Sequence, residues 1–555
     1  MKFFQQLLVA PAALGLLAPV AASAAELNIN GVSDYAASGE QVTSISQFSD
    51  VYPTDWAYQA LNNLIERYGC VAGYPNGTYR GNRAMTRFEA AALLNACLDR
   101  VTEVTDELKR LMAEFEKELA ILKGRVDGLE ARVGELEATQ FSTTTKLKGQ
   151  TTFVMGATTA GGDSVDNTPW NNRTGGGGAN AYNKEFGAFT FNYDQRLVFN
   201  TSFTGKDKLY ARLRAGNFDN GNAFDGGGVN LTKLDIAEAT EGNVVLDRLY
   251  YKFPVGKEFT VIAGAVARNT ESLAMWPSVY NKGGAKILDY FALAGTPGVY
   301  NKETGQLIGA YWKQKVKKGA NAFSVSVNYV ADDGEGNNSD STSGGFMTDN
   351  SRANLLAQIG YGGPEWGVAF GYRYGQCQSG MRRSTQFVQN GLGVKSDNFN
   401  LDCQKPVGTR SSNSYALNAY WQPKKAGFIP SISVGWALNN ISGDNIEEGS
   451  YTTSQSWFTG LKWDDVFLKG NDLGFAFGQP TFATALKGGG TPFDGNYAFE
   501  LYYNFQVTDN IAITPALFYL SRPGGQSTSA LVDNGRGYDG TFNIFGGLIQ
   551  TTFKF

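Results

Sequence analysis

The sequence predicts a mainly β protein: a 16-stranded antiparallel transmembrane β-barrel, preceded by a small α-helical domain and a coiled-coil helix. Three observations support this fold class. Apolar residues recur at every second position in many segments of residues 141–555, as strands with one apolar face require. Short turns alternate with long polar connections along this region, which is the loop pattern of outer-membrane barrels. The last strand alternates in the same way and ends in an aromatic residue, Phe555.

The composition narrows the class of protein. The chain has 555 residues, too many for one ordinary hydrophobic core. It carries 48 Lys and Arg against 52 Asp and Glu, and this acidic excess argues against a nucleic-acid partner. Histidine is absent, which removes histidine-based catalysis and histidine metal ligands. We therefore expect no enzyme activity, no resident metal and no cofactor.

The N-terminus predicts export. Lys2 precedes an apolar stretch, and Ala22-Ser23-Ala24 forms a small-residue cleavage site, so residues 1–24 have the features of a secretory signal peptide. No later run of 18 apolar residues exists, so we expect no membrane-spanning helix.

The four cysteines form two pairs that are local in the sequence, Cys70 with Cys97 and Cys377 with Cys403. An even count in an exported protein favours two disulfides. No C-x-x-C motif occurs, which disfavours a zinc site.

Residues 45–100 predict two helices joined by a turn. The first helix has apolar residues at helical spacing, with Thr54 or Asp55 as its N-cap, and the second begins near Thr86. A turn at Tyr74-Pro75-Asn76-Gly77 separates them.

The same residues resemble an S-layer homology (SLH) module. The resemblance rests on F-x-D-V at residues 48–51, the following Trp-Ala pair, G-Y-P-x-G-T-Y at 73–79 and T-R-x-E at 86–89. It implies binding to peptidoglycan or a wall-linked polysaccharide, with Trp56, Gly73, Thr86 and Arg87 as contacts. The alternative is that Trp56 belongs to the core and that Thr86 only caps a helix.

Residues 101–140 predict a coiled coil. Val101, Leu108, Phe115, Leu122, Leu129 and Leu136 repeat every seven residues, and other apolar residues lie between them. Two successive steps of four near Phe115 form a stutter, which relaxes the supercoil locally. The mixed apolar seam leaves dimer and trimer open.

The barrel strands follow from the alternating runs in residues 141–555. We expect them near residues 147, 189, 209, 246, 259, 306, 322, 353, 368, 414, 429, 456, 472, 496, 511 and 542. The alternation is shortest near 306 and 472.

The charges within these strands indicate which face meets lipid. In residues 207–217 (DKLYARLRAGN), leucine and alanine alternate with Arg212 and Arg214. An arginine facing the bilayer midplane costs about 2–4 kcal/mol, so both arginines are expected to face a water-filled lumen. The same alternation predicts a set of pore-lining residues: Asp194, Arg196, Arg212, Arg214, Arg248, Lys252, Arg352, Arg373, Lys462 and Glu500. Cations outnumber anions in this set, so we expect a basic lumen.

The order of signal peptide, SLH module, coiled coil and barrel resembles the cyanobacterial outer-membrane porins of the carbohydrate-selective porin family, whose relatives include iron-uptake porins. The resemblance covers essentially the whole mature chain. It implies a homotrimeric channel in outer-membrane lipid, with the SLH module and the coiled coil in the periplasm. It does not define the solute.

The third long loop, residues 269–304, contains the apolar stretch AKILDYFALAG. Apolar residues are unusual in a loop that faces water. Related porins fold this loop into the barrel, which implies a constriction with Lys282, Lys286 and Asp289 as rim charges. The alternative is a loop packed at a subunit contact.

Two functions remain open at this point. The first is passive diffusion of small hydrophilic solutes and ions through a polar lumen, with a preference for anions. The second is a structural tether that joins the outer membrane to the cell wall and uses the barrel only as an anchor.

Overall fold

The computed structural model describes two compact units, residues 1–136 and residues 137–555. Within them, the described residues are 44–69, 71, 77–81, 84, 94, 144–163, 178–219, 221–282, 286–376, 381–390, 411–443, 446, 448–531 and 537–555. The signal peptide, the coiled coil, the second SLH helix and all four cysteines lie outside these residues, so the two disulfides and the coiled coil stay predictions.

The first unit contains helix α4 (Tyr58–Tyr68), preceded by the 3-10 turn η1 (Ile45–Gln47). Leu61 and Ile65 face inward and pack against η1, as the helical spacing predicts. The predicted N-cap is wrong, because Ala57 occupies that position and no side chain caps the helix. The Asp55 carboxylate instead accepts a hydrogen bond from the backbone N–H of Tyr52, at 2.7 Å, and closes the preceding turn.

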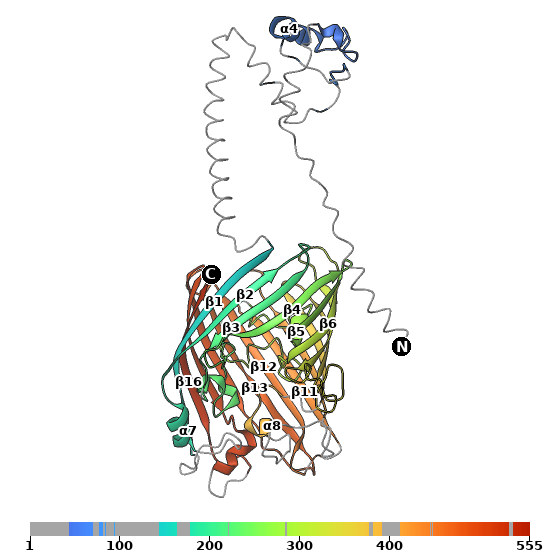
Figure 1. Ribbon diagram of the computed structural model, residues 1–555. Coiled ribbons are helices and arrows are strands. Elements are labelled where there is room, and N and C mark those ends of the chain that lie inside the picture. Colours follow the sequence, from blue (N-terminus) through green and yellow to red (C-terminus); the bar gives the residue numbers. More distant parts are fainter. Residues whose placement is uncertain are drawn as a thin grey trace, which may run out of the picture. The chain divides into compact units, whose positions relative to one another are not determined.

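The second unit is a closed barrel of sixteen antiparallel strands (Figure 1). Each strand pairs with its neighbours in the chain, and β1 pairs with β16 to close the cylinder. All sixteen predicted strands are present, so the fold class is confirmed. The strands are β1 Thr145–Gly161, β2 Thr190–Thr201, β3 Lys208–Gly216, β4 Val245–Val255, β5 Phe259–Arg268, β6 Thr304–Lys313, β7 Ala322–Asp332, β8 Asn354–Gly362, β9 Trp366–Gln376, β10 Ser411–Trp421, β11 Ser431–Ser442, β12 Tyr451–Asp464, β13 Asp472–Leu486, β14 Tyr497–Thr508, β15 Ile511–Ser521 and β16 Asn543–Lys554.

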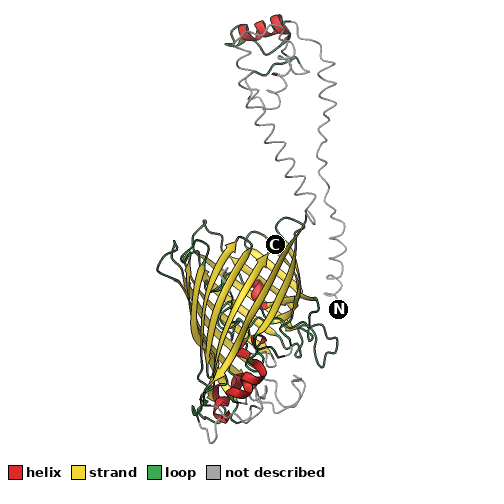
Figure 2. Ribbon diagram, turned by 90° about the vertical axis from the view of Figure 1, so that its left-hand side faces the viewer, coloured by secondary structure: helices red, strands yellow, loops and turns green. Residues whose placement is uncertain are grey.

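The connections are sorted between the two ends of the barrel. Helices α7 (Ala179–Phe186) and α8 (Gln386–Asn390) lie in long connections at the end opposite to the C-terminus (Figures 1 and 2). Two connections at that end, 443–450 and 487–496, are shorter than the sequence pattern predicts. Short 3-10 turns complete the long connections: η2 Ala223–Asp225, η3 Asn230–Thr232, η4 Asn269–Ser272 and η5 Gly525–Leu531. Among the described helices, none is both long and apolar enough to cross a membrane.

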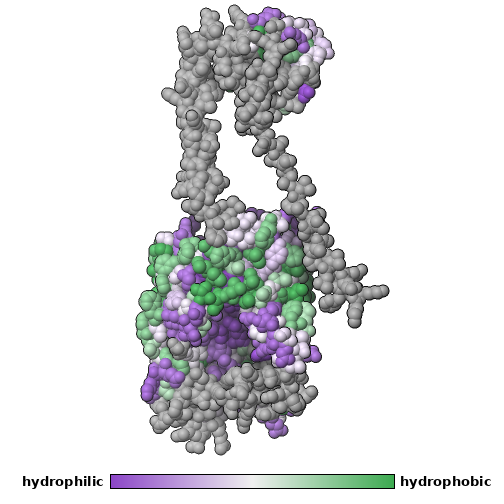
Figure 3. All heavy atoms as spheres, in the orientation of Figure 1, coloured by the Kyte–Doolittle hydropathy of each residue, from purple (hydrophilic) through white to green (hydrophobic). Residues whose placement is uncertain are grey.

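Alternate side chains face opposite sides of the wall. On β7, Phe323, Val325 and Val327 are exposed on the outer face, whereas the intervening serines are buried inside. Figure 3 shows hydrophobic residues gathered in a band across the barrel face in view. This arrangement matches the apolar belt that lipid requires and leaves the polar side chains for the interior.

If the outer face meets lipid, an arginine placed on it is expected to destabilise the barrel more near the middle of the membrane than near its edge. Leu501 and Val507 are similarly exposed on the outer face of β14, but Leu501 lies in the middle of the strand and Val507 beside a short turn. We expect Leu501→Arg to lower the free energy of unfolding from lipid vesicles by about 2–4 kcal/mol, and Val507→Arg by about 0–1 kcal/mol. Urea titration of the folded barrel in vesicles measures both values. Equal losses at the two positions would contradict the assignment of this face to lipid.

Candidate functional site

The predicted pore-lining residues fall on the inner parity of the strands. Five of them are at most 2% exposed: Asp194, Arg214, Arg248, Arg373 and Glu500. Arg196, Arg212, Lys252 and Lys462 share that parity and are partly exposed, and Arg352 lies two residues before the start of β8.

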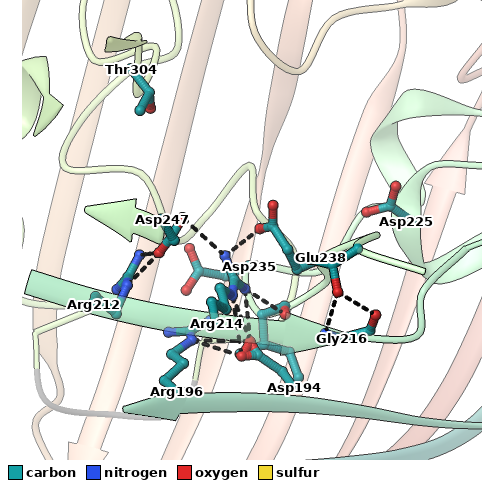
Figure 4. A network of polar contacts seen from close by, with 12 residues as sticks. Asp194, Arg196, Arg212, Arg214, Gly216, Asp225, Asp235, Glu238, Asp247 and Thr304 are labelled. Atoms are coloured by element: carbon teal, nitrogen blue, oxygen red, sulfur yellow. Dashed lines mark hydrogen bonds and ion pairs between the residues drawn. The ribbon is translucent and has the colours of Figure 1, made fainter. Parts of the chain in front are cut away.

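The arginines of β2 and β3 form a network of ion pairs (Figure 4). The Asp194 carboxylate lies 2.8 Å from a guanidinium nitrogen of Arg196 and 2.8 Å from one of Arg214. Arg214 also pairs with Glu238 and donates to the carbonyl of Ile236 at 2.8 Å. The second long loop (217–244), which carries Glu238, is thereby attached to the inner wall.

A β-bulge places an additional carboxylate on the inner face, at a residue that a strict alternation of inner and outer positions would not place there. In the β3–β4 pair, Arg212 stands opposite Arg248 and Leu213 opposite Leu246, so Asp247 is the extra residue. A bulge allows two consecutive side chains to face one side. Asp247 therefore pairs with Arg212 and with its own neighbour Arg248.

In this inner network the predicted cations are paired with carboxylates and are not free, and the basic character of the whole lumen stays a prediction. Counting strand positions alone misses the carboxylates of the bulge and of the loops, which offset the inward cations. Two other predicted inner cations also have carboxylate partners. Arg352 pairs with Asp332 and Glu335, and Lys462 pairs with Asp464 at 3.0 Å.

The third long loop (269–303) runs inside the barrel and contacts the far wall. Its backbone N–H groups at Val279 and Tyr280 donate to the Ser433 hydroxyl of β11, at 2.9 and 3.0 Å. The Tyr300 hydroxyl donates to Gln358 of β8 at 2.7 Å. The alternative of a loop held at a subunit contact does not match these contacts.

Glu500 of β14 holds the middle of this loop. Its two carboxylate oxygens accept from the Tyr280 hydroxyl at 2.7 Å and from the Leu288 backbone N–H at 2.6 Å. All three residues are buried, so the contact is shielded from water. This role for Glu500 differs from the water-facing lining position that the sequence pattern predicts.

The second and third long loops pack against each other. Leu234 and Leu288 form an antiparallel bridge, and Asp235 N–H donates to the Ile287 carbonyl at 2.8 Å. Their apolar side chains share one buried cluster with the inner faces of β12–β16, of which Phe458 and Phe518 are members. Part of the barrel interior is therefore filled.

Asp289 lies at the centre of a buried charge cluster. It is 1% exposed and forms ion pairs with Lys302, Arg382 and Arg383. Asp289 is therefore not a water-facing rim charge, because its carboxylate joins the third loop to the connection after β9. Arg382 and Arg383 are absent from the sequence prediction, since no periodic pattern links a loop arginine to a partner about a hundred residues away.

Two cavities lie against the third loop. One of about 450 Å³ has a lining that includes Lys302, Thr304 and Arg382. The other, of about 810 Å³, lies at the short-turn end and includes Trp276, the predicted rim residue Lys282 and Tyr311. Lys286, the remaining predicted rim residue, is half-buried and lines neither cavity. Within the described ranges, no group of three or more acidic, cysteine or histidine residues is placed to hold a metal ion.

The SLH unit presents one candidate wall contact. Trp56 is 98% exposed, which excludes the alternative that it belongs to the core. In the same unit, the Asp50 carboxylate accepts from the N–H groups of Tyr79 and Arg80, each at 2.6 Å. Desolvation opposes its charge, but these hydrogen bonds lower the pKa of Asp50 below its usual value, so the turn is held by a carboxylate ion. Gly73, Thr86 and Arg87 lie outside the described residues.

Fold and interior together define an outer-membrane barrel of the porin class. The family model of the carbohydrate-selective porins, OprB family, matches residues 103–555, and the S-layer homology domain model matches residues 47–91. The chain belongs to the OprB family of carbohydrate-selective porins and carries an SLH domain. It is located in the outer membrane, with its SLH domain on the periplasmic side.

The similar proteins include two cyanobacterial ones. An uncharacterized protein of Nostoc sp. is 36% identical over 529 residues, covering 88% of this chain and 83% of its own. A second, from Synechocystis sp., is 31% identical over 541 residues, covering 90% and 91%. The outer membrane protein SlpA of Thermus thermophilus is 34% identical over 103 residues, which are 16% of this chain and 11% of SlpA. Among solved structures, Pseudomonas putida OprB is 12% identical with a TM-score of 0.45, covering 76% of this chain and 96% of its own.

The contacts of Glu500 predict a test of the inner loop. Glu500→Ala leaves the Tyr280 hydroxyl and the Leu288 N–H without their acceptor, at a cost of about 1–3 kcal/mol for each unpaired buried group. We expect the loop to detach and the single-channel conductance to rise. Glu500→Gln keeps an acceptor oxygen and is expected to change conductance less. Equal conductance in wild type and Glu500→Ala would show that this carboxylate does not fix the loop.

Proposed function

We propose that the protein is a water-filled channel for passive diffusion of small hydrophilic solutes and inorganic ions. The observation that carries this proposal is the polar inner face with a cavity at each side of the third loop. The apolar outer face supports it, because lipid then surrounds the polar interior. In this proposal the third loop narrows the passage, and the paired inner charges hold the loop in place.

Diffusion through a channel requires only a continuous polar path. The inner wall of β7 to β11 supplies serine, asparagine and glutamine side chains that hydrogen-bond to the third loop, for example Ser326 and Gln358. These buried groups hold the loop against the wall without adding a fixed charge, and neutral groups bind ions weakly, which favours passage over retention.

A structural tether is the second candidate, and the filled part of the interior favours it. The apolar cluster between the inner loops and β12–β16 leaves less space than an empty barrel of this strand number. The two functions are compatible, and a conducting lumen separates a channel from an anchor.

Planar lipid bilayers provide the direct measurement. We expect the purified full-length protein to produce discrete, ohmic conductance steps in KCl, because ions cross a hydrated lumen by diffusion. A protein that inserts into the bilayer without conducting would favour the tether and contradict the channel.

We also propose that the SLH domain anchors the barrel to peptidoglycan or a wall-linked polysaccharide and that the chain forms a homotrimer. The exposed indole of Trp56 supports a role in binding a wall polymer, because a bare aromatic face has no stabilising partner among the described residues of its own unit. Gly73, Thr86 and Arg87 are the further proposed contacts, carried over from the SLH motif.

Co-sedimentation with purified cell walls tests the anchor. Trp56→Ala is expected to weaken binding by about tenfold or more, which corresponds to about 1.4 kcal/mol. Tyr52→Ala is the matched control, because Tyr52 is another exposed aromatic residue, 60% accessible, in the same unit. Equal binding by both variants and wild type would remove Trp56 from the interface.

A further inference from the structure

Six lysines surround the cavity at the short-turn end of the barrel. They come from the β4–β5 turn, the third long loop, the end of β6 and the β6–β7 turn, and all are exposed: Lys257, Lys282, Lys313, Lys315, Lys317 and Lys318. We call this set the lysine collar. It shares no residue with the ten predicted pore-lining residues, and only Lys282 is also one of the predicted constriction-loop charges.

The collar carries almost no compensating charge. None of the six lysines forms an ion pair with a carboxylate in the part of the chain that the structure describes. Glu258 is the acidic residue in the cavity lining. Its carboxylate accepts from the Trp312 indole at 2.9 Å and from the backbone N–H of Lys315 at 3.2 Å, so a single negative charge faces six positive ones.

The inner arginines differ from the collar in this respect. Arg212 and Arg214 lie against Asp247, Asp194 and Glu238, so their fields cancel over a few ångströms. Unpaired charges act over about 10 Å at 0.1 M salt, which is comparable to the width of a pore mouth. A recess lined by one sign of charge also concentrates counter-ions. Compared with Arg212 and Arg214, the collar therefore carries the unbalanced charge, and it lies at the short-turn mouth.

We propose that the lysine collar determines the charge selectivity of the channel by collecting small inorganic and organic anions at its periplasmic mouth. The inner arginines then position the loops and contribute little to selectivity. This inference rests on the proposed channel function. Because the collar lies at one end only, the current is expected to differ between the two voltage polarities, and the anion preference is expected to weaken as salt rises.

The test measures reversal potentials of the full-length protein in planar bilayers under a tenfold KCl gradient. The variant Lys315→Gln/Lys317→Gln/Lys318→Gln removes three collar charges. We expect its chloride-to-potassium permeability ratio to fall by about threefold or more towards unity, with conductance steps retained. The charge-reversal variant with glutamate at these three positions is expected to prefer potassium.

The control removes lysines at the other end of the barrel. Lys184 of α7 and Lys487 of the connection after β13 are both exposed and lie in the long connections, away from the short-turn mouth. The double glutamine variant of these two lysines is expected to keep the wild-type ratio. An equal shift in both variants, or an unchanged ratio in both collar variants with normal conductance, would overturn the collar proposal and leave the channel function intact. Absence of conductance in the wild-type protein would instead overturn the channel function.

Discussion

The hydrocarbon of a bilayer offers no hydrogen bonds, and this constraint determines the rest of the structure. Every backbone N–H and C=O group at that depth needs a partner within the protein, so the sheet has to close. Closure here is the pairing of β1 with β16, the first and last strands of the cylinder. Once closed, the wall has one face in lipid, and the apolar side chains of each strand, such as Val325 and Val327, occupy it.

The polar inner face then creates a second requirement, because buried charges and hydrogen-bonding groups need partners as well. Two inner loops supply several of them. Glu238 and Ile236 accept from Arg214, and the third loop places the Tyr280 hydroxyl and the Leu288 backbone N–H on Glu500. The inner charges therefore act mainly as structural contacts, whereas the exposed lysines at the short-turn mouth keep their charge available to solutes.

The sequence predicts the elements well and their contacts poorly. Strand alternation places all sixteen strands and their inner parity, because lipid enforces a period of two over most of the chain. It cannot reveal Asp247, since a bulge breaks the period at that residue. It also cannot pair Leu288 with Glu500, because that contact joins residues 212 positions apart in the chain through the folded lumen.

Spin labels along β7 test the central claim, a lipid-facing outer wall around a polar interior, most directly. In a background without native cysteines, single labels at Ser324, Val325, Ser326 and Val327 report collision with oxygen, which concentrates in lipid. The structure predicts high oxygen accessibility at the two valines and low accessibility at the two serines, in strict alternation. Uniform accessibility, or the opposite alternation, would contradict the orientation of the wall.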